Sequence, residues 1–164
     1  MSQITLQGNT INTIGSLPTV GSTATDFSFV DEHLATKSLS DYFDKTIILN
    51  IFPSIDTGTC ASSVRKFNQL VSGMDNVVVL CISKDLPFAH TRFCGAEGIN
   101  NVKSLSDFRS DDFGKEYGLI LADSPLQGLL ARAVVVIKDG FIAYTELVEE
   151  ITQEPNYEKV LVSL

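Results

Sequence analysis

The stretch Ile47-Ile-Leu-Asn-Ile-Phe-Pro-Ser-Ile-Asp-Thr-Gly-Thr-Cys60 indicates an α/β fold, because a predicted strand, a loop and the start of a helix follow one another in it. The nearly continuous apolar run from Ile47 to Phe52 predicts a buried strand, which Pro53 ends because proline has no N–H for a sheet. From Cys60 onward the period becomes helical, with one apolar face formed by Cys60, Val64, Phe67 and Val71.

Further α/β elements follow this unit. Val77–Ile82 predicts a second buried strand, and Pro87 predicts the first turn of a helix that ends near Cys94, with Gly95 as its left-handed terminal residue. A short helix is expected over Asp111–Tyr117, ending at Gly118. Consecutive strand–helix units place neighbouring strands parallel, with helices against the sheet.

The two ends of the chain predict further strands. The expected elements are an N-terminal β-hairpin (Gln3–Gln7 and Thr10–Ile14, turning at Gly8-Asn9), an edge strand (Phe27–Val30), a second hairpin (Ala133–Ile137 and Phe141–Val148, turning at Lys138-Asp139-Gly140) and a terminal helix (Glu154–Leu164). The late hairpin adds antiparallel strands, so we expect a mixed sheet flanked by helices on both faces. This is a thioredoxin-like α/β layout, and residues 1–164 are expected to form a single domain.

Composition restricts the class of partner. The chain has 20 acidic against 12 basic residues, a net charge of −8, and no Lys/Arg cluster, so neither nucleic acid nor an anionic membrane surface is an expected partner. Its longest strongly apolar run, Val77–Ile82, is too short for membrane insertion. The first basic residue is Lys37, so a secretory signal is not expected. We therefore expect a cytoplasmic location.

Three cysteines, Cys60, Cys81 and Cys94, are an odd number for a disulfide framework. No CxxC pair is present, and no histidine or carboxylate cluster accompanies the thiols in the pattern of a zinc site. Catalysis and simple core packing are therefore the main alternatives.

Cys60 is a candidate nucleophile because it lies in the first turn of a predicted helix. A thiolate there lies beside free N–H groups and the positive end of the helix dipole, which favours the nucleophilic form. Thr57 can direct its hydroxyl at the sulfur or at a bound oxygen, and Pro53 can exclude water without offering a donor. The spacing alone leaves open that Cys60 is a small core residue and Thr57 an ordinary helix cap.

A resemblance favours catalysis. The pattern Pro53-x-x-x-Thr57-x-x-Cys60 resembles the active-site motif of the peroxiredoxins. The runs 52–68, 78–89, 92–98 and 132–137 are together similar to the bacterial thiol peroxidase subfamily, an atypical two-cysteine class. The resemblance spans nearly the whole chain and implies a thioredoxin-like peroxiredoxin fold.

The resemblance also implies roles for five residues. Cys60 corresponds to the peroxidatic cysteine, which becomes a sulfenic acid, and Cys94 to the resolving cysteine, which then forms an intramolecular Cys60–Cys94 disulfide. Thr57, Pro53 and Arg132 correspond to the other active-site residues. From the residues alone, Arg132 in an apolar strand could instead form a salt bridge with one of the acidic side chains.

The activity implied by the resemblance is reduction of hydrogen peroxide and of alkyl or lipid hydroperoxides. Thioredoxin is the implied reductant, a homodimer the implied assembly, and neither a metal nor an organic cofactor is implied. An alternative is a redox sensor that passes oxidation from the same cysteine pair to a partner protein. Both functions begin with the same sulfenic acid, so the cysteines do not separate them.

Three expectations concern individual residues. Cys81, in the middle of a buried strand, is expected to be an inert core thiol. His90 is expected to be a solvated helix residue. Since Cys60 and Cys94 lie on different helices, we expect the first turn around Cys60 and the helix end at Cys94 to unwind before a disulfide forms.

Overall fold

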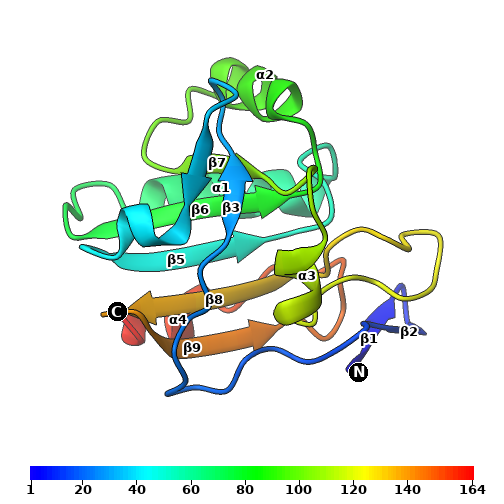
Figure 1. Ribbon diagram of the computed structural model, residues 1–164. Helices are drawn as coiled ribbons and strands as arrows, with labels where there is room; N and C mark the ends of the chain where they lie inside the picture. Colours follow the sequence, from blue (N-terminus) through cyan, green and yellow to red (C-terminus); the bar gives the residue numbers. More distant parts are fainter.

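A computed structural model describes residues 1–164 and arranges them around one seven-stranded mixed sheet, with a separate two-stranded hairpin at the N-terminus (Figure 1). The elements are β1 (Gln3–Leu6), β2 (Asn9–Asn12), β3 (Ser28–Val30), β4 (Thr36–Ser38), the 3-10 helix η1 (Leu39–Tyr42), β5 (Thr46–Ile51), α1 (Gly58–Leu70), β6 (Val77–Ser83), α2 (Pro87–Glu97), β7 (Lys103–Ser106), α3 (Asp112–Glu116), β8 (Ala133–Lys138), β9 (Phe141–Leu147) and α4 (Tyr157–Val162). None of these helices combines the length and apolar character needed to cross a membrane.

The strand order in the large sheet is β4-β3-β7-β6-β5-β8-β9. Strands β5, β6 and β7 are parallel, because α1 and α2 carry the chain back to the end of the sheet at which the preceding strand began. Strand β8 pairs antiparallel with β5, and β9 pairs antiparallel with β8. The predicted mixed thioredoxin-like sheet is therefore confirmed, with β5 near its centre.

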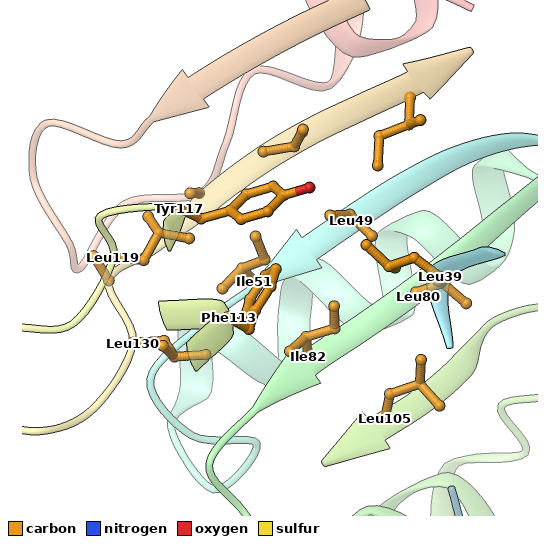
Figure 2. Packing of buried hydrophobic residues seen from close by; sticks show 14 of the residues in the cluster. Leu39, Leu49, Ile51, Leu80, Ile82, Leu105, Phe113, Tyr117, Leu119 and Leu130 are labelled. Carbon is orange, nitrogen blue, oxygen red and sulfur yellow. The ribbon is translucent and has the colours of Figure 1, made fainter. Parts of the chain in front are cut away.

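Successive side chains of β5 point to opposite faces of the sheet and contribute to a hydrophobic core on each face. Ile47, Leu49 and Ile51 belong to the core that α3 and the N-terminal hairpin cover; Figure 2 shows part of this cluster, where Phe113 and Tyr117 lie over Ile51. Ile48 and Phe52 belong to the second core, under α1 and α4. Strands buried on both faces need nearly continuous apolar sequence, which is what the runs at 47–52 and 77–82 provide.

The prediction of an edge strand at Phe27–Val30 was wrong. Strand β3 lies between β4 and β7, and the edge is formed by β4. Strand β4 was missed because Thr36-Lys-Ser38 is short and polar, and β7 because Lys103-Ser-Leu-Ser106 contains no apolar run. Neither strand shows an alternation long enough to recognise in the sequence.

Two turn positions also differ from expectation. The N-terminal hairpin turns at Gln7-Gly8, both with positive φ (51° and 80°), rather than at Gly8-Asn9, because glycine takes the second position of this turn. Helix α2 continues through Gly95 to Glu97, and Gly98 supplies the left-handed end with φ of 65°. The second hairpin turns at Asp139-Gly140 as predicted, with φ of 52° and 78°.

Candidate active site

Cys60 lies in the first turn of α1, which begins at Gly58, two residues before the predicted start. Thr57 caps this helix: its Oγ1 accepts from the backbone N–H of Cys60 at 3.4 Å. The same hydroxyl donates to Cys60 Sγ at 2.7 Å, which is nearer than its other acceptor, the carbonyl oxygen of Ser54 at 3.2 Å. Thr57 therefore both fixes the helix start and places a donor on the sulfur, which a threonine serving only as a cap would not do.

Arg132 reaches the same sulfur from the chain segment just before β8. Its Nη2 lies 3.3 Å from Cys60 Sγ, its Nε donates to the carbonyl oxygen of Ile151 at 2.9 Å, and the residue is only 2% exposed. No carboxylate pairs with Arg132, so the alternative of a salt bridge to an acidic residue was wrong. A buried guanidinium needs a compensating group, and here the sulfur takes that position.

The second terminal nitrogen of Arg132 has no partner. Nη1 is buried and makes no hydrogen bond within the protein, while Nη2 already contacts the sulfur. A buried unpaired donor costs free energy unless a bound group satisfies it. Arg132 can thus donate at the same time to Cys60 and to an oxygen atom bound beside it.

The sulfur lies in an apolar, enclosed environment. Cys60 has no exposed surface and belongs to the same core cluster as Phe52 and Ile55. Pro53, directly after β5, is also buried. In such surroundings the hydrogen bonds from Thr57 and Arg132 act on the sulfur more strongly than they would in water.

The backbone carbonyl oxygen of Cys60 accepts a hydrogen bond from a polar network that was not predicted from the sequence. Ser63 Oγ donates to the Cys60 carbonyl oxygen at 2.8 Å, and Asn50 Nδ2 donates to Ser63 Oγ at 3.2 Å. Asn50, within an otherwise apolar strand, was the available signal. Buried amides in proteins usually have hydrogen-bond partners, and here the Nδ2 group of Asn50 has them, whereas its Oδ1 has none.

Cys94 lies apart from this group. Its Sγ is 3.5 Å from Ser104 Oγ of β7, and the residue lines a surface cavity of about 530 Å³ together with His33 and Lys37. Partial burial raises the pKa of the Cys94 thiol. All three cysteines are free thiols. The structure brings Cys60, Thr57 and Arg132 together, and Cys94 lies outside this group.

Cys81 is fully buried in β6, where Asn50 Nδ2 lies 3.7 Å from its sulfur. Burial raises the pKa of this thiol to about 12. A thiol that stays protonated and has no access to solvent is a poor nucleophile. Its surroundings are those of the inert core residue expected from the sequence.

The expectation for His90 was wrong, because the side chain is only 2% exposed. Its Nε2 lies 2.8 Å from Ser83 Oγ at the end of β6. Asp85, two residues later, accepts hydrogen bonds from Ser54 and Ile55 in the loop that leads to Cys60. Polar residues directly after a buried parallel strand were the signal, since the carboxyl ends of such strands line functional sites.

No group of three or more His, Cys, Asp or Glu side chains converges in a way that could hold a metal ion. The chemistry that the site residues offer is that of the Cys60 sulfur, with two donors directed at it.

Comparison with known proteins identifies the family. The Redoxin family model matches residues 19–161. A thiol peroxidase of Mycobacterium tuberculosis is 56% identical over 165 residues, covering 100% of this chain and 99% of the relative. The chain belongs to the bacterial thiol peroxidases of the redoxin family. A thiol peroxidase of Corynebacterium glutamicum is 51% identical over the same span, with 100% and 99% covered.

Solved structures place this thiol peroxidase in the peroxiredoxin fold. A peroxiredoxin-like protein from Aquifex aeolicus superposes with a TM-score of 0.93 at 39% identity, covering 99% of this chain and 95% of that one. A thiol peroxidase from Chromobacterium violaceum has the same fold, with a TM-score of 0.90 at 19% identity, covering 98% and 93%. The protein is thus a thiol-dependent peroxidase enzyme with a thioredoxin-like peroxiredoxin fold.

Proposed function

We propose that this enzyme reduces hydrogen peroxide and organic hydroperoxides, and that Cys60 is the attacking residue. The observation that carries the proposal is the pair of donors, Thr57 and Arg132, on a sulfur in the first turn of α1. The Cys60 thiolate attacks the terminal peroxide oxygen and the O–O bond breaks. The alkoxide or hydroxide leaves, takes up a proton as alcohol or water, and Cys60 becomes a sulfenic acid.

Arg132 supports the negative charge during this step. Its Nη2 contacts the sulfur, and its unpartnered Nη1 is free to donate to a peroxide oxygen as the O–O bond lengthens. Pro53, buried beside the loop, keeps water from competing for these donors. Since Cys60 is fully covered in this state, substrate entry requires displacement of a side chain over the sulfur.

Organic hydroperoxides, including those of lipids, are the substrates we favour. The apolar residues Phe52 and Ile55 belong to the same buried cluster as Cys60, so an alkyl chain that enters with the peroxide would meet apolar side chains there. The test compares the second-order rate constants of Cys60 oxidation by hydrogen peroxide and by cumene hydroperoxide. We expect the organic peroxide to react faster. Equal rate constants would contradict a preference for organic hydroperoxides based on the apolar surroundings of Cys60.

Cys94 is the resolving cysteine in this proposal. Its thiol attacks the Cys60 sulfenic acid, water leaves, and an intramolecular disulfide forms. A disulfide needs Cα atoms within about 7 Å, so we expect the first turn of α1 and the end of α2 to unwind in each cycle. Oxidised and reduced structures with identical backbones in both segments would contradict this movement.

Peptide mapping by mass spectrometry tests the pairing. After one equivalent of peroxide we expect a bond between Cys60 and Cys94, with Cys81 still free. Any other pairing would refute the assignment of the resolving residue.

Thioredoxin is the reductant we propose for this disulfide. The alternative, a redox sensor that passes oxidation to a partner protein, would begin with the same sulfenic acid. Steady-state oxidation of NADPH with thioredoxin and thioredoxin reductase separates the two functions. Continuous turnover supports the peroxidase cycle, whereas one equivalent of peroxide consumed without turnover supports the sensor.

We further propose that residues 1–164 form one domain, that two copies form a homodimer, and that the enzyme works in the cytoplasm. Apolar clusters on both faces of one sheet support a single domain. Phe88 on α2 is 66% exposed and offers apolar surface for a second copy. Sedimentation equilibrium of the protein and of Phe88→Ser tests the dimer: we expect weaker association in the variant.

A further inference from the structure

Helix α2, which carries Cys94, is anchored by few buried residues. Of its 11 residues only Pro87 and His90 are buried, and Ala89 and Phe93 are only partly buried against the core under α1. Helices in proteins owe most of their stability to such packing. Two ion pairs also link α2 to its surroundings, Arg92 with Asp56 and Glu97 with Arg65, but both are exposed, and exposed ion pairs contribute little to stability. The attachment of α2 therefore depends strongly on the contacts of its one buried polar side chain, His90.

The contacts of His90 fix its hydrogen-bonding role. Ser83 Oγ donates its single proton to Asp85 Oδ2 at 2.6 Å. The 2.8 Å contact between His90 Nε2 and the same hydroxyl oxygen must then use a proton on Nε2, so His90 donates to Ser83. His90 Nδ1 is buried without a partner, and Asp85 Oδ2 lies 3.8 Å from Nε2, beyond hydrogen-bond distance, so the bond to Ser83 is the one hydrogen bond of the ring.

Asp85 connects this attachment to the loop before Cys60. Its Oδ1 accepts from Ser54 Oγ and its Oδ2 from the backbone N–H of Ile55, each at 2.7 Å. Burial would raise the pKa of Asp85, but the His90 ring and the hydrogen bonds from Ser83, Ile55 and Ser54 outweigh it and hold the value at about 2. One carboxylate thus holds the Cys60 loop directly, and through Ser83 the helix that carries Cys94.

We propose that His90 is a positioning residue for the resolving step: its hydrogen bond to the Ser83–Asp85 pair fastens α2, and release of this bond sets how fast Cys94 reaches oxidised Cys60. The proposal rests on the Cys60–Cys94 pairing described above. In the step concerned, the Cys94 thiol and the Cys60 sulfenic acid form a disulfide and water. The competing step is oxidation of the sulfenic acid by a second peroxide, which gives a sulfinic acid and an alcohol.

His90→Leu retains apolar volume in the buried position but removes the hydrogen bond. Loss of one hydrogen bond of ordinary net strength shifts an opening equilibrium about fivefold. We therefore expect disulfide formation about fivefold faster and the sulfinic fraction correspondingly smaller, while the first oxidation of Cys60 is unchanged. His90→Gln can still donate to Ser83, so it should restore the rate of the original enzyme.

Two further variants complete the set. Ser83→Ala removes the same hydrogen bond from the other partner, together with the bond from Ser83 to Asp85, and should speed disulfide formation at least as much as His90→Leu. Adding His90→Leu to Ser83→Ala should give no additional acceleration. Thr91→Ala, at the exposed neighbouring position of α2, is the matched control and should leave all three rates unchanged. If His90 served only as packing, His90→Leu would behave like the original enzyme and His90→Gln would show no specific rescue.

Rapid-quench mass spectrometry with cumene hydroperoxide measures the sulfenic, disulfide and sulfinic forms of each variant over time. Hydrogen exchange of the α2 amides in the reduced protein reports opening of the helix without relying on any disulfide. Exchange about fivefold faster in His90→Leu, and faster by at least as much in Ser83→Ala, but not in His90→Gln or Thr91→Ala, is expected.

The outcomes separate this proposal from the proposed function. Unchanged disulfide rates in both His90→Leu and Ser83→Ala would overturn the positioning role while leaving the peroxidase cycle intact. Absence of a Cys60–Cys94 bond in the original protein would refute the proposed cycle and with it the role of His90 in resolution. Hydrogen exchange would still show whether His90 fastens α2.

Discussion

Arg132 Nη2 lies 3.3 Å from Cys60 Sγ, although the two residues are 72 positions apart in the chain. The sheet creates this proximity: β8 pairs with β5 in a register that sets Ala133 opposite Ile51, so Arg132 emerges beside the loop that follows β5. The guanidinium is fixed by its bond to the carbonyl of Ile151. A cation held in this way needs no reorganisation when charge develops on the reacting atoms.

Replacing Arg132 with Lys should lower the second-order rate constant for Cys60 oxidation about a hundredfold, because a single ammonium cannot donate to the sulfur and to a peroxide oxygen in the same fixed geometry. Stopped-flow measurement of peroxide consumption gives the rate constant. Arg109→Lys, at an exposed arginine outside the site, is the control and should change it little. A change of less than twofold in Arg132→Lys would rule out the proposed role.

Thr57 allows a comparison of two substitutions. Thr57→Ser keeps the hydroxyl and should retain most of the activity, whereas Thr57→Val loses the donor at 2.7 Å from Cys60 Sγ and also the helix cap. We expect Thr57→Val to lower the oxidation rate at least tenfold and the free energy of unfolding by about 1 kcal/mol. Urea denaturation and peroxide kinetics measure the two effects separately. Equal kinetics in both variants would argue against a role of the hydroxyl.

The three cysteines should respond differently to substitution by Ser. Cys60→Ser should abolish peroxide reduction, since it removes the nucleophile. Cys94→Ser should allow one oxidation of Cys60 but block turnover linked to thioredoxin. Cys81→Ser, which changes a buried thiol that makes no contact with peroxide, should leave turnover nearly intact. Coupled NADPH oxidation measures all three, and inactivity of a folded Cys81→Ser protein would contradict the division of roles.

Asp85 should make stability depend on acid pH. Its pKa in the folded protein is held at about 2, below the ordinary 3.8, so its carboxylate stabilises the fold above pH 4 and loses this effect as the pH falls from about 4 to about 2. Asp85→Asn should therefore melt at a lower temperature than the original protein at pH 6. The difference should shrink as the pH falls toward 2. Thermal unfolding at pH 6, 4 and 3 measures it, and a difference independent of pH would show that charge is not the cause.

Much of the central fold was predictable because its signals are local. The apolar runs of β5 and β6, the helical period after Cys60 and the Asp139-Gly140 turn each report structure within a few residues. The short polar strands β4 and β7 lack such signals, because their pairing is decided by neighbouring strands. As a result β3 was predicted as an edge although it lies inside the sheet.

The local half of the site follows from the sequence: Thr57 and Cys60 meet because Cys60 is the third residue of the helix and lies three positions after its N-cap. Three other features depend on long-range packing: Arg132 faces a sulfur instead of a carboxylate, His90 is buried against Ser83, and Cys94 lies against Ser104. Helical and strand periods specify which side of an element is apolar. They do not specify which distant element covers that side, because this depends on strand order and register across the whole sheet.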